Sequence, residues 1–255
     1  MEEFGAAAGW RIEVHPELPS TSSCLVALAR GGAPDGLAVL ALRQTAGRGQ
    51  GGRRWSDAPG NLALSVLLRP RHPAREAPQW GLLGGVALAE TARAVDPEPD
   101  AFALRWPNDL LRHGAKCAGL LAESAVTPEG DLAWVVLGFG VNLAHAPEVP
   151  GRATARLGHG LAPEPFAARL LDRLSIWRQR VGAEGFGPIR DAWEAHGPAR
   201  GQRIAVRCGP GTEEGGFAGL AGDGSLLLET DRASLLRIAS GEVLETCPGQ
   251  RVEAG

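Results

Sequence analysis

The chain has 255 residues, 44% of them hydrophobic and 22% charged, with a formal net charge of −3. This length fits one large domain, or one domain with a small appendage, and the charge gives no global basic field for nucleic acid or an anionic membrane. No apolar run approaches the roughly 20 residues of a membrane span, and the N-terminus lacks a secretory pattern, so we expect a cytoplasmic protein. The four cysteines are scattered and form no CxxC pair, so we expect no structural metal.

Strands and helices alternate along residues 1–197. A Ser/Thr start and a glycine stop predict a helix over 22–30. Residues 37–43 form a continuous apolar run typical of a buried strand, whereas 61–68 alternate and predict a half-buried strand. The same reasoning predicts strands at 101–106, 115–123 and 134–143, a turn at 112–114 that returns one strand beside another, and helices at 80–95, 163–181 and 189–196.

From residue 198 the pattern changes to short strands with tight turns. Asp223-Gly224 is a strong hairpin signal between two of them. We therefore expect a small β-barrel after the larger domain, and we divide the chain into 1–197 and 198–255. The predicted strands of the barrel are 203–208, 216–221, 225–230 and 234–239.

Lys116 is the only lysine among the 26 lysine and arginine residues. A composition this biased uses arginine wherever a generic positive charge is sufficient. The lysine ammonium is a compact point charge that approaches a single phosphate or carboxylate oxygen, which the flat guanidinium group does less well. Lys116 is therefore a candidate for contact with such an oxygen, and chance retention of a surface lysine is the alternative.

The densest cluster of unusual residues is the Gly- and Arg-rich segment 44–55, which directly follows a predicted buried strand. Its glycines allow close approach of the backbone to a ligand, its arginines provide charged donors, and Trp55 offers a flat face for a base. The spacing matches neither a Walker A loop nor a dinucleotide fingerprint. A solvated mobile loop and an RNA-binding Arg/Gly segment remain alternatives.

Three further segments place polar residues beside predicted strands or helix starts. Asn108 and Asp109 follow a strand and point to a nucleotide hydroxyl or a hydrated Mg²⁺, although a structural turn is the alternative. The glycines of 138–140 suggest a ligand ring against bare backbone, or merely close backbone packing. Residues 20–22 supply hydroxyls to a ligand or only cap a helix. No histidine receives a role, so the sequence suggests electrostatic and positional catalysis on an anionic ligand, without a covalent nucleophile.

Taken in chain order, these segments resemble the biotin–protein ligases (biotin–[acetyl-CoA-carboxylase] ligases). The resemblance rests on Ser-Thr at 20–21, Gln-x-x-Gly-Arg-Gly and Arg-x-Trp within 44–55, Trp-Pro-Asn-Asp at 106–109 with Lys-x-x-Gly at 116–119, and Gly-x-Gly-x-Asn at 138–142. It extends from about residue 10 to 245. It implies an α+β fold, in which a mixed sheet flanked by helices, as in class II synthetases, precedes a C-terminal SH3-like β-barrel.

The resemblance implies two steps: biotin and ATP, bound with Mg²⁺, form biotinyl-5′-AMP, and the biotinyl group then passes to a lysine of a biotin carboxyl carrier domain. Lys116 and Arg48 would be catalytic, the Gly/Arg loop would close over the adenylate, and Asp109 is the candidate for a Mg²⁺ ligand. The implied biotin contacts are Ser20, Thr21, Ser22, Gln44, Arg48, Gly49, Gln50, Lys116 and Gly119. The implied nucleotide contacts are Gly47, Arg48, Arg53, Trp55, Asn108, Lys116, Gly140 and Asn142.

The sequence departs from the family pattern at Ser22, where the family has Asn, and at Gln50 and Gly51, where it has a second Arg and a basic or variable residue. We expect Gln50 to give a looser lid that leaks biotinyl-AMP. With Lys116 as its only side-chain amine, the protein should scarcely label itself. No winged-helix segment precedes residue 10, so we expect no DNA-binding repressor function and no membrane partner, and either a monomer or a homodimer.

Two other functions remain open at this stage. One is a lipoate or octanoate ligase or transferase on the same scaffold; the long Arg/Gly loop and the Trp-Pro-Asn-Asp run favour biotin over it. The other is a non-catalytic binder of a nucleotide, of RNA through the Arg/Gly loop, or of another small ligand. A non-catalytic binding function would leave Lys116 and Asn108 without a common explanation.

Overall fold

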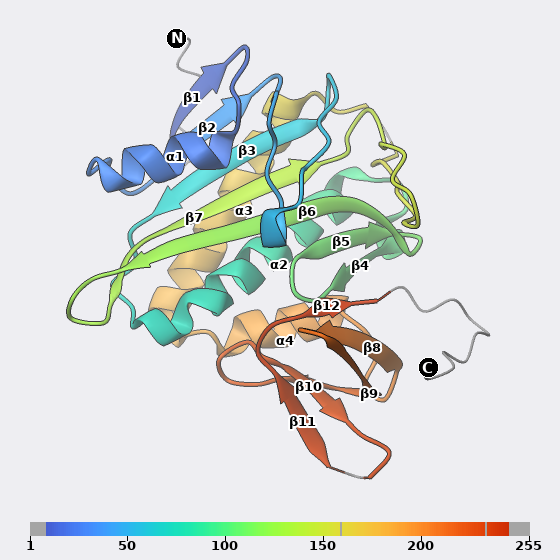
Figure 1. The fold of residues 1–255 in the computed structure, drawn as a ribbon. Helices are drawn as coiled ribbons and strands as arrows, with labels where there is room; N and C mark the ends of the chain where they lie inside the picture. Colours follow the sequence, from blue (N-terminus) through green and yellow to red (C-terminus); the bar gives the residue numbers. More distant parts are fainter. Residues whose placement is uncertain (1–8, 159, 233, 245–255) are drawn as a thin grey trace.

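The computed structural model describes residues 9–158, 160–232 and 234–244 (Figure 1). Seven strands form one sheet in the order β1-β2-β3-β7-β6-β5-β4, in which only β1 and β2 pair in parallel. The sheet is therefore mixed, as predicted. Its strands are β1 (Arg11–His15), β2 (Leu37–Ala41), β3 (Leu62–Leu68), β4 (Phe102–Arg105), β5 (Asp109–Arg112), β6 (Ala115–Val126) and β7 (Leu132–Val141).

Helices cover both faces of this sheet. Helix α1 (Thr21–Arg30) lies on one face, and α2 (Ala77–Val95), α3 (Pro163–Glu184) and α4 (Gly187–His196) lie on the other side (Figure 1). This arrangement confirms the predicted α+β class with a mixed sheet flanked by helices. Three short 3₁₀ turns are η1 (Gln50–Gly52), η2 (Ala74–Glu76) and η3 (Pro99–Ala101).

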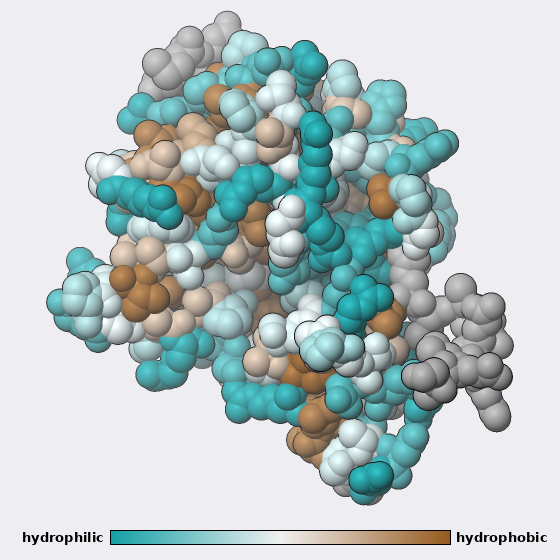
Figure 2. All heavy atoms as spheres, viewed as in Figure 1, coloured by the Kyte–Doolittle hydropathy of each residue, from teal (hydrophilic) through white to brown (hydrophobic). Residues whose placement is uncertain are grey.

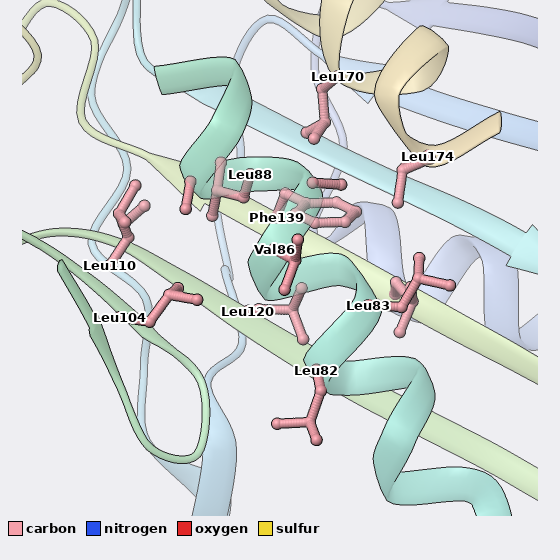
Figure 3. Close-up of a cluster of buried hydrophobic side chains, with 14 of the residues drawn as sticks. Leu82, Leu83, Val86, Leu88, Leu104, Leu110, Leu120, Phe139, Leu170 and Leu174 are labelled. Atoms are coloured by element: carbon pink, nitrogen blue, oxygen red, sulfur yellow. The ribbon is translucent and has the colours of Figure 1, made fainter. Parts of the chain in front are cut away.

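The main core lies between α2 and the sheet. Leu83 and Val86 of α2 point toward Leu120 of β6 and Phe139 of β7 (Figure 3). Gly84 permits this close packing, because a Cβ atom there would lie 2.5 Å from Leu120 Cδ1. A rigid core at this point fixes β6 and β7, the strands that carry most of the site described below.

Two predictions about the sheet are wrong in detail. Strand β3 is buried at all seven positions, not on one face, because α1 covers Leu67 while α2 and α3 cover the opposite side. The strand predicted at 101–106 does not pair with 115–123. Strand β5 lies between them and pairs with both β4 and β6, so two consecutive hairpins replace one. Strand β1 was not predicted.

The C-terminal strands form a second, antiparallel sheet in the order β11-β10-β9-β8-β12. Its strands are β8 (Arg203–Cys208), β9 (Gly211–Leu220), β10 (Leu226–Glu229), β11 (Leu235–Ile238) and β12 (Glu242–Val243). Within the described ranges β11 and β12 end the sheet at opposite edges, so its closure into a barrel is not seen. Phe217 and Leu226 belong to the same buried cluster as Trp193 of α4, and Trp106 Nε1 donates to the Gly224 carbonyl at 3.2 Å. The division at 197/198 stays a prediction.

Among these described residues, none of the helices is long and apolar enough to span a membrane.

Candidate functional site

A cavity of about 340 Å³ opens where the ends of β6 and β7 meet the start of α1. The loop between β2 and β3 covers it, and the face of the molecule over that loop is mostly hydrophilic (Figure 2). The cavity brings together most of the residues predicted from sequence. Those in its lining are Thr21, Ser22, Gln44, Arg48, Gly49, Gln50, Arg53, Trp55, Asn108, Lys116, Gly119, Gly140 and Asn142.

Three predicted residues lie just behind the lining. Ser20 caps α1 by accepting a hydrogen bond from Ser23 N at 3.3 Å. The carbonyl of Gly47 accepts from Trp55 N at 3.0 Å, which closes the base of the Gly/Arg loop. Asp109 lies beneath Lys116. All three support side chains that do line the cavity.

One end of the cavity is lined with hydroxyl groups. Gln44 Oε1 accepts from Thr21 N at 2.8 Å and from Thr21 Oγ1 at 3.2 Å. Ser65 Oγ, fully buried on β3, lies 2.8 Å from Thr21 Oγ1 and 3.1 Å from Ser22 Oγ. Gly138 leaves the space for them, because a Cβ atom there would lie 2.3 Å from Ser22 Oγ. Sequence reasoning missed Ser65, whose signal was one polar residue in an otherwise apolar strand.

Lys116 is held by a buried carboxylate. Its Nζ donates to Asp109 Oδ1 at 2.5 Å, and Asp109 Oδ2 accepts from Arg105 Nη2 at 2.9 Å. Burial lowers the pKa of Lys116, while the Asp109 carboxylate favours the ammonium form and opposes that fall. The result is a desolvated cation at the cavity wall, where its interaction with a ligand anion is stronger than in water.

The Mg²⁺ ligand proposed at Asp109 stays a prediction, and Asp109 could bind the ion only after releasing Arg105 or Lys116. Both of its carboxylate oxygens accept hydrogen bonds from cationic side chains. Among residues 9–158, 160–232 and 234–244, His, Cys, Asp and Glu form no cluster of three that could hold a metal.

The other end of the cavity is formed by Trp55 and two asparagines. The Trp55 indole lies flat against Gly140, where a Cβ atom would lie 2.4 Å from the ring, and Lys116 Nζ is 5.8 Å from the ring centroid. The sequence predicted a ligand ring against the bare backbone of residues 138–140. In this structure the indole of Trp55 lies there. Asn108 Nδ2 donates to Leu120 O at 2.6 Å, and Asn142 Nδ2 donates to Ala155 O at 2.9 Å.

Two buried polar atoms at this end, Trp55 Nε1 and Asn142 Oδ1, have no hydrogen-bond partner among the residues that the structure describes. Buried polar groups are nearly always paired, because an unpaired one has a desolvation cost of about 1–3 kcal/mol. Trp55 Nε1 and Asn142 Oδ1 are therefore polar atoms of this end whose hydrogen-bonding capacity is not used.

Ion pairs hold the arginines of the Gly/Arg loop. Arg48 makes a bidentate pair with Glu123 of β6, at 2.8 and 3.0 Å. Arg53 Nη1 donates to Glu242 Oε1 of β12 at 2.6 Å, and Arg152 donates to the same oxygen. Sequence reasoning missed Glu123, Arg152 and Glu242, because nothing in the local sequence distinguishes them from other surface charges.

The loop is folded on itself between these contacts. Gly49 N donates to Arg53 O at 2.8 Å, and Gly51 and Gly52 both adopt positive φ in η1, which glycine allows without strain. At its base, Asp57 Oδ2 accepts from Gln44 N at 2.6 Å, and burial raises the pKa of Asp57. The loop therefore has a defined conformation, in which Arg48 and Arg53 bind acidic partners and Arg54 Nη2 donates to the Thr45 carbonyl at 2.8 Å.

Comparisons with known proteins identify the family of this chain. The model of the biotin/lipoate A/B protein ligase family matches residues 17–142, which contain all of the cavity residues predicted from sequence. A biotin–[acetyl-CoA-carboxylase] ligase of Paracoccus denitrificans is 36% identical over 74% of this chain and 82% of its own length. Another, of Mycobacterium tuberculosis, is 39% identical over 69% of this chain and 68% of its own length.

Among solved structures, the biotin protein ligase from Aquifex aeolicus in complex with biotin and ATP is similar, with a TM-score of 0.74 and 26% identity. The similarity covers 91% of this chain and 97% of that one. The fold class predicted from the sequence is thus found again in a biotin protein ligase. Together with the relatives above, these matches show that the chain belongs to the biotin/lipoate A/B protein ligase family.

Proposed function

We propose that this protein is a biotin protein ligase that activates biotin with ATP and transfers it to the carrier domain of a biotin-dependent carboxylase. One observation carries the proposal: the two ends of the cavity lie in order along β7. Gly138 faces the hydroxyl end, and Gly140, two residues farther along the strand, faces Trp55. Gly119, which pairs with Gly140 on β6, lies against Lys116. Alternate residues of a strand lie about 7 Å apart on one face, so a single elongated ligand reaches both ends.

In the first step a biotin carboxylate oxygen attacks the α-phosphorus of ATP. The new P–O bond forms as the bond to the β-phosphate oxygen breaks, and pyrophosphate leaves. The ureido ring lies at the Thr21 and Ser22 hydroxyls, which places the carboxylate toward Lys116. The buried Lys116 ammonium stabilises negative charge on the α-phosphate oxygens as it develops, and Arg48 contributes once it leaves Glu123.

In the second step an uncharged lysine amine of the carrier attacks the acyl carbon of biotinyl-5′-AMP. A C–N bond forms, the C–O bond to AMP breaks, and the amine releases a proton. The Gly/Arg loop covers the mixed anhydride and keeps water from it until the carrier arrives. Arg53 and Trp55 lie on this loop, and Asn108 and Asn142 lie at the nucleotide end.

The alternative substrate is lipoate or octanoate. Lipoate stands beside biotin in the name of the family. The hydroxyl end of the cavity favours biotin. An octanoyl chain or a dithiolane ring would cover Thr21, Ser22 and Ser65 with apolar atoms, whereas the ureido group offers both donors and an acceptor. We further propose a cytoplasmic monomer or homodimer with no DNA or membrane partner.

The test is transfer to an isolated biotin carboxyl carrier domain, followed by intact-protein mass spectrometry. The enzyme is incubated with ATP, the carrier domain and one of biotin, lipoate or octanoate. We expect a biotinyl mass increment on one carrier lysine, and none when that lysine is replaced by arginine. Modification by lipoate or octanoate in place of biotin would overturn the proposed substrate. No modification by any acid would favour a non-catalytic binder.

A further inference from the structure

One charged side chain of the small C-terminal sheet binds two arginines of the cavity wall. Glu242 stands on β12, the edge strand that lies toward the Gly/Arg loop (Figure 1). Its Oε1 atom accepts from Arg53 Nη1 at 2.6 Å and also from Arg152 Nη2. Arg53 belongs to the loop between β2 and β3, and Arg152 to the loop that follows β7. Both arginines line the cavity.

One carboxylate thus joins three parts of the chain that are far apart in sequence. Burial opposes the charge of Glu242, but hydrogen bonds from Arg53 and Arg152 outweigh it, so the pKa of Glu242 lies below its ordinary value. Only a quarter of the Glu242 and Arg152 side chains is exposed. Without this carboxylate, two guanidinium groups would face each other at the rim of the cavity, and the loop would lose its contact with β12.

We propose that Glu242 is a positioning residue that fastens the Gly/Arg loop to the rim of the cavity and aims Arg53 and Arg152 at the bound anion. The three side chains together carry one net positive charge. The carboxylate bonds one nitrogen of each guanidinium group, and Arg53 Nε also donates to the Gln50 carbonyl at 3.1 Å. These contacts restrict rotation of the guanidinium groups, and the N–H donors that they do not use can bind phosphate oxygens. The small sheet therefore helps to complete the site. The part of this inference that concerns ATP rests on the proposed function; the fastening of the loop does not.

The fastening is tested on the full chain without any ligand, by limited digestion with trypsin. Trypsin must take an arginine side chain into its own pocket, and Arg53 enters it only after releasing Glu242. We expect Glu242→Gln to raise the initial rate of cleavage within residues 46–55 roughly fivefold, the factor expected for a partly exposed ion pair. The matched control is Glu229→Gln on β10 of the same sheet, which should cleave as the wild type does.

A second variant separates this role from a general loosening of the small sheet. Arg152→Gln should also raise the cleavage rate, and the double variant with Glu242→Gln should add less than the product of the two effects, because both remove parts of one network. Equal protection of the loop in Glu242→Gln and wild type would overturn the inference. So would equal acceleration in Glu229→Gln, which would indicate a disturbed sheet.

The effect on the site is read from biotin-dependent exchange of pyrophosphate into ATP. We expect Glu242→Gln to raise the KM for ATP several-fold and to leave the KM for biotin within a factor of two, because the hydroxyl end is remote from β12. If the wild type shows no exchange, the proposed function fails while the digestion result still stands. If exchange is normal and the KM for ATP does not change, Glu242 does not aim the arginines.

Discussion

Gly140 should not tolerate a side chain without movement of the Gly/Arg loop. Its missing side chain leaves the surface on which the Trp55 indole lies, and a Cβ atom would meet three atoms of that ring at 2.4, 2.7 and 2.8 Å. Contacts between carbon atoms are favourable at about 3.5–4.0 Å, so Gly140→Ala requires the indole to withdraw by roughly 1 Å. Strand β7 itself is fixed between β3 and β6 and does not give way.

The substitution should destabilise the closed conformation of the Gly/Arg loop and not the fold. Overpacking of this kind costs about 1–3 kcal/mol, whereas each partly exposed ion pair of the loop contributes about 1 kcal/mol or less. The loop should therefore lift, and exchange of its amides with deuterium should accelerate roughly 5- to 150-fold, the factor that matches this range of free energy. The midpoint of thermal unfolding should change little, because the core is untouched.

Hydrogen exchange with mass spectrometry checks this on peptides that cover residues 46–55, with peptides of α2 as the internal reference. Gly182→Ala, in α3, is the matched control, because a Cβ atom there meets nothing within 4 Å. It should leave loop exchange unchanged and stabilise the helix by up to about 1 kcal/mol. A large loss of global stability in Gly140→Ala with an unchanged loop would refute the reasoning, since the sheet would then bear the strain.

Three further outcomes follow from the site. Gln50→Arg should slow release of biotinyl-AMP from the enzyme in a rapid-dilution assay; an unchanged rate would remove Gln50 as the cause of a loose lid. Mass spectrometry after prolonged turnover without carrier should find almost no self-biotinylation, because Lys116, the only side-chain amine in the chain, is held by Asp109; heavy labelling would contradict this. Because burial raises the pKa of Asp57, its protonated form stabilises the fold at low pH, and that contribution is lost as pH rises from about 4 through the folded pKa. The thermal unfolding midpoint of the wild type should therefore lose this contribution as pH rises over that interval, whereas the midpoint of Asp57→Asn should not. Identical dependence of the two midpoints on pH would exclude Asp57 as the titrating group.

A fourth outcome concerns the ion pair between Arg48 and Glu123. If a ligand carboxylate competes with Glu123 for Arg48, then Glu123→Gln should lower the KM for biotin in the exchange assay, by about fivefold for a pair worth roughly 1 kcal/mol. Val126 on the same strand is largely exposed, and Val126→Thr serves as the control. An increased KM in Glu123→Gln would mean that Glu123 positions Arg48 for the ligand and does not compete with it.

The local features of the site could be predicted because each has a short-range physical cause. The glycines of segment 44–55 and of 138–140 signal close backbone approach, and the structure places Gly138 and Gly140 against Ser22 and Trp55. The single lysine stood out by composition, and it lies in the cavity. The four helices and most strand cores were also predicted, since apolar periodicity acts over a few residues. Only α1 begins at a side-chain cap, and α2 and α4 begin three and two residues before their predicted starts.

Features that depend on distant partners could not be predicted. The pattern of β3 alternates, but burial of both its faces depends on α1 as well as α2, which one strand's sequence does not encode. Strand β5 is four residues long and follows a turn, so its own periodicity is too short to detect. Glu123, Arg152 and Glu242 acquire meaning only from their partners, up to 189 residues away in the case of Arg53 and Glu242.

The most direct test of the proposed function is biotin-dependent exchange of labelled pyrophosphate into ATP, measured on the wild type and on Lys116→Arg. We predict exchange with biotin but not with lipoate or octanoate. In Lys116→Arg the exchange should fall by about 10²–10³-fold, the usual effect of losing one donor that stabilises transition-state charge, because a guanidinium group does not fit between Asp109 and the ligand. Full exchange in Lys116→Arg would show that the buried ammonium has no specific role, and absence of exchange with every acid in the wild type would contradict the ligase function itself.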